Sequence, residues 1–567
     1  MMVKQLTPFL LSVLHKLLPI FSCLGMSLVT APIYAQESGD VSSPSASQEE
    51  EAGGAQPPAK IQVKVTSPEQ NAVMKRALER IDARRMRSSQ KGISGDASSA
   101  DKKQGGEVSA GMTAGSAHEA SHHGSARQGL GQRLKQRLKS QETLLATHKR
   151  FSRFPLTLPL PLDELKTTSC AIFLSNLESR LKRVKALYDQ EIDKPDSAFA
   201  YWATMYSRAQ LYSDIEGLVT VKKSVDSLVT KFDQHNRLRM LRARVAMTLH
   251  QLPATQVDLA WLKSRADLPS QMKRDIEDLS REVDLQLGVR VAEHIKAMQK
   301  EYSQPSYRNF ILVAQAREFQ GQTSLAQRYY GQAERRFKDV APIPLAWLNV
   351  QRGLLAMHSG DYEAAQRFFK AGYDRCPQYP MAVEHLAEIE GRLGNLERST
   401  ELYEVVIQQT QHPEFMAALA EVYLQRGMKE KAEELTQKAS RRFAQLEAIA
   451  PEAMSAHAAD FYRGLGKSPT HALELLRRNY TLRPNAHAQQ ALADILIELD
   501  HLVDAEKLIH SLMDNPEEFA EKYWTAAKLA LAQKRIDQAK KYEEKAKKLN
   551  SRIADLEGEL IPLKGSK

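Results

Sequence analysis

The chain is poor in the residues that stabilise small or cofactor-bearing folds. Its 567 residues include only three cysteines, Cys23, Cys170 and Cys376. So few cysteines exclude a disulfide-rich framework and a zinc site made of paired cysteines. Beyond residue 35, no apolar run approaches the roughly 20 residues that a membrane-spanning helix requires. That part of the chain is therefore expected to contain no membrane span.

Most sequence signatures of catalysis are also missing. There is no G-x-S-x-G elbow and no G-x-G-x-x-G turn after a strand. Gly466–Ser468 ends like a phosphate-binding loop, but Phe461 occupies the position of its leading glycine. His118–His122 matches the H-E-x-x-H zinc-peptidase pattern, yet its surroundings lack the apolar periodicity of a rigid helix. We therefore expect no enzyme activity, no cofactor and no metal site, with a zinc metallopeptidase as a remote alternative.

The first 35 residues have the layout of a secretory signal peptide. Lys4 and Lys16 lie in a basic leader, the apolar run Leu17–Val29 follows, and Ala35 precedes a polar stretch. We expect cleavage there and export, to the periplasm of a bacterium. The alternative is an uncleaved inner-membrane anchor at Thr7–Ala31, which would place Lys16 near the bilayer centre.

Residues 36–129 are rich in Ser, Gly, Ala, Gln and charge, and poor in aromatic residues. Such a composition buries too little apolar surface to offset the entropy of ordering, so disorder is predicted. A short basic helix is expected near 67–87, and a second basic helix with a proline-rich linker over 130–162. These two helices carry part of the formal net charge of +10. They could contact an anionic lipid or glycan surface, or they could remain solvated. A nucleic-acid partner is not expected.

Beyond residue 162, apolar residues recur at helical spacing and no sustained alternation of period two is present. We expect residues 163–306 to form degenerate helix pairs of open register. From 307 to 549 a fuller pattern repeats roughly every 34 residues. Gly360 and Gly394 mark turns, Phe369 is a bulky position, and Gly353 is a small position in the preceding helix. A small residue also recurs in the second helix of each unit. It is Ser399 in one unit and alanine in the others, at Ala326, Ala365, Ala432, Ala472, Ala505 and Ala539.

This pattern resembles the tetratricopeptide repeat (TPR), a helix pair of roughly 34 residues. The resemblance implies an all-α fold: a right-handed superhelical solenoid of about seven TPR helix pairs, of an exported bacterial type. Residues 550–567 are expected to form a capping helix and tail. In such an elongated array, Cys170 and Cys376 would rarely approach the short Cα separation of a disulfide, so we expect two free thiols.

TPR arrays usually bind peptides or partner helices on the concave face, which is lined by the first helix of each pair. The resemblance therefore implies a set of partner-binding positions in this chain. They are Trp347, Val350, Leu354, Met357, His358, Glu384, Glu388, Arg392, Phe461 and Trp524, with Glu421, His457, Gln490 and Asp494 further along. For Trp347 and Met357, the alternative is packing against the adjoining unit. We expect a non-catalytic scaffold or adaptor that binds proteins or peptides of the cell envelope, with binding of an anionic surface by the basic arm as the alternative.

Overall fold

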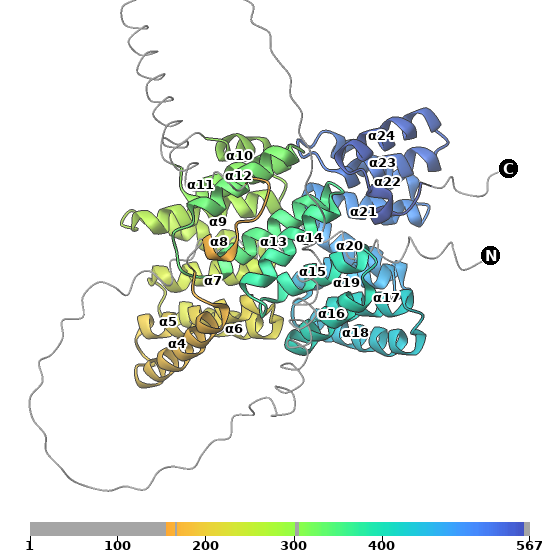
Figure 1. Cartoon of the computed structure of the whole chain (residues 1–567). Coiled ribbons are helices and arrows are strands. Elements are labelled where there is room, and N and C mark those ends of the chain that lie inside the picture. The colour runs from red at the N-terminus through yellow and green to blue at the C-terminus, as the bar shows by residue number, and fades with distance from the viewer. Residues whose placement is uncertain (1–154, 165–166, 301–304, 561–567) are drawn as a thin grey trace, which may run out of the picture. The chain divides into compact units, whose positions relative to one another are not determined.

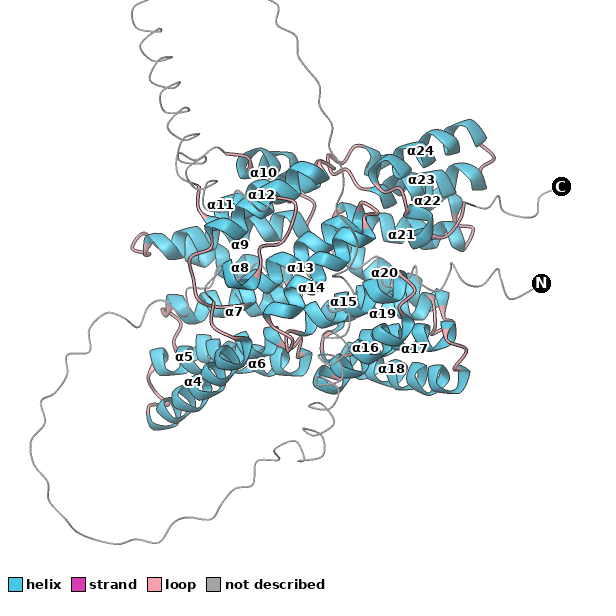
Figure 2. Ribbon diagram, viewed as in Figure 1, coloured by secondary structure: helices cyan, strands magenta, loops and turns pink. Residues whose placement is uncertain are grey.

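The computed structural model describes residues 155–164, 167–300 and 305–560, and these ranges are all-helical (Figures 1 and 2). They contain no strand, which confirms the predicted all-α fold. None of their helices combines the length and apolarity that a membrane crossing requires. The predicted signal peptide, disordered region and basic helices, and the His118–His122 motif, lie outside the described residues.

The helices before the repeat array follow a short 3-10 turn, η3 (Leu162–Glu164), and run in sequence along the chain (Figure 1). They are α4 (Cys170–Gln190), α5 (Pro195–Leu211), α6 (Ile215–Lys231), α7 (Asn236–Thr248), α8 (Leu252–Lys263), α9 (Ser270–Gln286) and α10 (Val291–Met298).

The array consists of consecutive helix pairs followed by one short helix. The pairs are α11 (Tyr307–Phe319) with α12 (Thr323–Arg336), α13 (Ile343–His358) with α14 (Tyr362–Arg375), α15 (Pro380–Arg392) with α16 (Leu396–Thr410), α17 (Pro413–Gln425) with α18 (Lys429–Ile449), α19 (Pro451–Arg463) with α20 (Pro469–Leu482), α21 (Ala486–Glu498) with α22 (Leu502–Met513), and α23 (Ala520–Ala532) with α24 (Ile536–Leu549). The short helix α25 (Ile553–Glu557) comes last.

Small residues let the two helices of a pair approach each other closely. A Cβ atom added to Gly353 would lie 2.3 Å from the Phe369 ring, so only glycine allows α13 and α14 to pack at this point. The recurring small residues of the second helices, Ala326, Ala365, Ser399, Ala432, Ala472, Ala505 and Ala539, are all buried. These buried small residues let the paired helices interlock closely, as the contact of Gly353 with Phe369 shows.

A tight turn with one residue at positive φ separates the helices of most pairs. Gly360 and Gly394 adopt φ values of 82° and 85°, which glycine tolerates without steric cost. Asp361 then begins α14, because its side chain accepts a hydrogen bond from the Ala364 amide at 2.9 Å. In later pairs, Lys467 and Asp500 adopt the same left-handed conformation although they carry side chains.

The segment before α4 is held against α12–α14 by a buried ion-pair network. Arg352 donates from Nη1 to Glu334 Oε2 at 2.6 Å and from Nη2 to the Leu156 carbonyl at 2.7 Å. Arg375 donates to the Leu160 carbonyl at 3.2 Å, and the Leu160 amide donates to Glu334 at 3.3 Å. Burial makes these bonds costly to break, because each lost partner would leave a buried charge uncompensated.

Cys170 and Cys376 form a disulfide, with Cα atoms 4.9 Å apart. The prediction of two free thiols was wrong. The prediction assumed that residues far apart in the sequence of an array are also far apart in space. The segment before α4, however, packs against α12–α14 of the array. The Thr168 amide donates to the Val340 carbonyl at 2.8 Å, which holds the start of α4 against the loop between α12 and α13.

Candidate functional site

The aromatic and apolar residues expected to bind a partner lie inside the helix stack. Trp347, Val350, Met357 and Trp524 each have 0% of their surface exposed. Phe461 is also buried, with its ring stacked 4.9 Å from that of Phe443. These side chains pack against other helices of the chain in this structure, which is the alternative kept for Trp347 and Met357. A periodic sequence pattern does not separate the packed face of a first helix from its open face.

Three of the predicted residues, Leu354 and His358 of α13 and Gln490 of α21, line a cavity of about 150 Å³. The cavity lies where α11 and α13 meet the starts of α21 and α23. Phe319 and Phe519 supply aromatic walls. The Glu518 amide donates to the Phe319 carbonyl at 2.8 Å, and this bond joins the two sides.

The cavity also contains carboxyl groups that the sequence did not single out, because they lie in loops or on unremarkable helix positions. Burial raises the pKa of Glu318 to about 7, although a 3.0 Å hydrogen bond from the Tyr330 hydroxyl counteracts it. Burial likewise raises the pKa of Glu517 to about 7 and lowers that of His487 to about 4. A positively charged group entering the cavity would therefore lower the pKa of these carboxyl groups and pair with their ionised forms, while His487 stays neutral.

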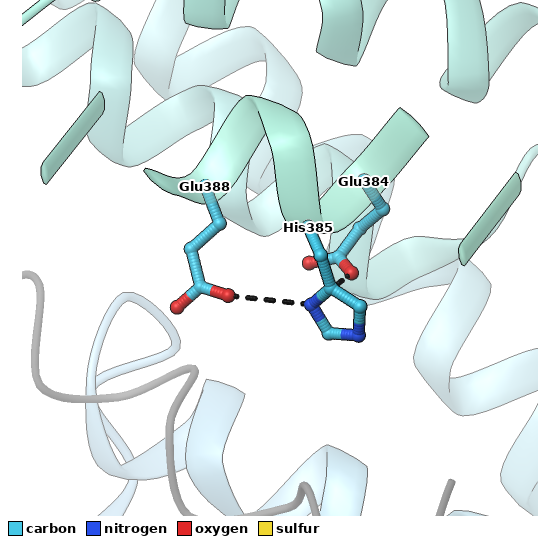
Figure 3. A group of neighbouring side chains, drawn as sticks. All are labelled: Glu384, His385 and Glu388. Carbon is cyan, nitrogen blue, oxygen red and sulfur yellow. Dashed lines mark hydrogen bonds and ion pairs between the residues drawn. The ribbon is translucent and has the colours of Figure 1, made fainter. Parts of the chain in front are cut away.

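A second polar cluster lies on α15, where Glu384, His385 and Glu388 converge (Figure 3). His385 Nδ1 lies 2.8 Å from Glu384 Oε2 and 3.5 Å from Glu388 Oε2. The other oxygen of Glu388 accepts a bond from Arg392 Nη2 at 2.8 Å. The His385 ring is stacked 5.3 Å from the Phe369 ring, so its orientation is fixed by the packing of α15 against α14 of the preceding pair.

The electrostatics of this cluster are dominated by burial and by the His385 contacts. Burial alone would lower the pKa of His385, but Glu384 and Glu388 outweigh it and raise the value to about 10. Burial raises the pKa of Glu384 against the opposing effect of His385. The positive charges that offset these two carboxylates are therefore the protonated His385 ring and the Arg392 guanidinium.

Further buried carboxyl and imidazole groups lie on α17, at the residue before it and on α19. Glu414 contacts His457 through one oxygen, and its other oxygen lies 3.7 Å from His412 Nδ1. Burial lowers the pKa of His412 to about 4, so this ring is neutral at physiological pH. Burial raises the pKa of Glu421 well above its ordinary value, and the nearby Glu388 adds to the effect.

Farther along, Asp494 of α21 is fully buried between cations. Arg463 lies 2.6 Å from one of its oxygens and Lys528 lies 2.9 Å from the other. Lys528 also reaches Glu557 of α25 at 3.1 Å, which ties the last helix to the array. The predicted residue Asp494 thus has a clear packing role in this structure.

No known protein-family model matches the chain, and no curated protein does. Among solved structures, a tetratricopeptide repeat protein from Parabacteroides merdae matches 44% of this chain and 97% of its own, with 16% identity and a TM-score of 0.28. A thermophilic TPR protein from Thermus thermophilus matches 35% of this chain and 98% of its own, with 18% identity and a TM-score of 0.26. The TPR domain of P58(IPK) matches 69% of this chain and 93% of its own, with 11% identity and a TM-score of 0.24. The helix pairs of the chain itself give it a TPR-like fold.

Proposed function

We propose that this protein is a non-catalytic scaffold of the bacterial cell envelope, and that it binds a protein partner through the first helices of its TPR-like array. The observation that carries the proposal is the cavity lined by Leu354, His358 and Gln490. It combines aromatic walls with the carboxyl groups of Glu318 and Glu517. An extended peptide that places a lysine or arginine there would bury its aliphatic stem on the walls and pair its charge with the carboxyls.

The disulfide between Cys170 and Cys376 supports the location in the envelope. Disulfides persist in oxidising compartments such as the periplasm and are rare in the cytosol. The predicted signal peptide supports the same location.

The experiment is a fluorescence-polarisation assay on the full chain, with a library of short labelled peptides that differ in one central residue. Peptides with a central lysine or arginine should bind, and those with glutamate should not. Glu517→Gln and His358→Ala should each weaken binding about tenfold. Glu506→Gln, at a half-exposed carboxylate paired with Arg535 at 2.9 Å, is the matched control and should bind like the wild type.

Two results would refute the proposal. One is equal binding of cationic and anionic central residues. The other is unchanged affinity in Glu517→Gln and His358→Ala while circular dichroism shows both variants folded. In the second case the partner would bind elsewhere on the chain.

A further inference from the structure

Three side-chain atoms of α15 are arranged as ligands of one metal ion. The atoms are His385 Nδ1, Glu384 Oε2 and Glu388 Oε2, which all lie within 4.8 Å of one another. Ligands at zinc's usual bond lengths lie about 3.3 Å apart in a tetrahedral site. The separations of 2.8 Å and 3.5 Å from His385 bracket that value, and the two carboxylate oxygens lie within 4.8 Å of each other (Figure 3).

The surrounding residues hold two of the three ligands in position, as outer contacts do in metal sites. Arg392 binds the outer oxygen of Glu388 and leaves the inner oxygen directed at His385. Phe369 stacks on the His385 ring. All three ligands are themselves buried, which makes the arrangement unlike a solvated acidic patch.

A carboxyl group of α17 and the histidine that precedes this helix also have buried polar atoms without a hydrogen-bond partner among the described residues. Glu421 is buried, and its Oε2 atom has no hydrogen-bond partner among the described residues. Its helix α17 contacts α15, and the charge of Glu388 contributes to the raised pKa of Glu421. His412 is buried too, and its Nδ1 atom lies 3.7 Å from Glu414 without a hydrogen bond within the described part of the chain. A buried carboxyl oxygen without a hydrogen-bond partner is a group that a bound cation could stabilise.

We propose that Glu384, His385 and Glu388 bind one divalent transition-metal ion on the inner side of α15. One imidazole and two carboxylates suit Zn²⁺ and leave a fourth position for water. The ion would offset the negative charges of Glu384 and Glu388 on α15, the helix that packs beside α17. This site goes beyond the proposed peptide binding, uses none of the cavity residues, and differs from the absence of metal expected from the sequence.

The test is zinc titration of the full chain after chelator treatment, followed by calorimetry and by metal analysis of the dialysed protein. His118, His122 and His123 are first replaced by alanine, because this histidine-rich stretch could bind zinc by itself. One zinc per chain should remain. Glu388→Gln and Glu384→Gln, which keep side-chain size, should each raise the Kd about 100-fold, whereas the control Glu401→Gln should leave it unchanged.

A second measurement keeps the result interpretable if a variant is unstable. Co²⁺ bound in place of zinc should give visible absorption bands that disappear in His385→Gln, with folding of the metal-free proteins checked by circular dichroism. If the histidine-depleted chain binds no zinc, or if a folded Glu388→Gln chain binds it as tightly as before, the proposal is wrong. Because the peptide assay uses different residues, the failure of either proposal is distinguishable from failure of the other.

Discussion

Single residues at the turns between paired helices carry a measurable conformational cost. Gly360, Gly394 and Gly427 adopt positive φ freely, whereas Lys467 and Lys534 adopt it with a side chain present. For residues other than glycine, the left-handed conformation costs roughly 1–2 kcal/mol. The fold is thus maintained in later pairs although the turn glycine is absent.

Exchanging the residue types at these turns should shift stability in opposite directions. Gly427→Ala should cost about 1 kcal/mol by backbone strain alone, since nothing lies within 4 Å of the added Cβ. Lys534→Gly, at φ 61°, should gain a similar amount. The control Lys541→Gly, in the interior of α24, should lose about 1 kcal/mol. Urea unfolding measures all three, and a loss of stability in Lys534→Gly would contradict the explanation.

Protonation of Glu318 should contribute to stability at low pH. Its folded-state pKa is raised by burial from 4.5 to about 7, so the folded state binds this proton more tightly than the unfolded state. The contribution is complete below pH 4.5 and is lost as the pH rises through about 7, up to about 3 kcal/mol in size. Glu318→Gln keeps an acceptor for Tyr330 and removes the titration.

The check on Glu318 is a comparison of unfolding free energies at pH 5 and pH 8. Glu517 and Glu282, whose pKa values burial also raises to about 7, titrate in both proteins, so only the difference between wild type and variant is informative. The variant should be the less pH-sensitive of the two. Parallel stability curves would show that Glu318 is ionised throughout this range.

At the scale of elements, the start of α4 is joined to the end of α14 by the disulfide. In the entropic treatment, closing a loop of this length raises the free energy of the unfolded chain by about 5 kcal/mol. This figure is an upper estimate for a repeat protein. Replacing Cys170 and Cys376 together by serine should lower the midpoint of thermal unfolding. The same midpoint should result from reducing the wild type, while the variant should not respond to reductant. If a maleimide reagent labels both cysteines in the unreduced native protein, the disulfide is not formed in solution.

The pairing of the helices could be predicted from the sequence, whereas contacts between distant helices could not. The pairs of the array follow from local periodicity, because a small residue such as Gly353 and a bulky one such as Phe369 must alternate where two helices cross. The cavity and the Glu334 network could not be predicted, since they join residues far apart in the chain. Trp347 illustrates the limit within a single helix: its position was correctly placed in the first helix of a pair, but whether it faces a partner or the core depends on neighbouring helices.

For the whole described chain, contacts between distant helices distinguish this array from a simple repeat protein, in which each unit touches only its neighbours. Arg442 of α18 binds Glu216 of α6 at 2.6 Å, and Arg483 after α20 donates to His250 Nε2, before α8, at 3.2 Å. The second contact is buried. Burial and the charge of Arg483 lower the pKa of His250 well below its ordinary value, so the ring is neutral and its nitrogen can accept this bond.

Such contacts should couple the unfolding of helices that are remote in sequence. Arg483→Met would leave His250 Nε2 and Asn479 Oδ1 without this donor, at a cost of about 2–4 kcal/mol. Native-state hydrogen exchange should then become faster in α7 and α8 and in α20 and α21 together, because both sides of the contact lose support. Arg398→Met removes a local, partly exposed pair with Glu401 within α16 and should change exchange only there, if at all. Faster exchange confined to α20 would show instead that each pair unfolds independently and that the distant contacts carry little energy.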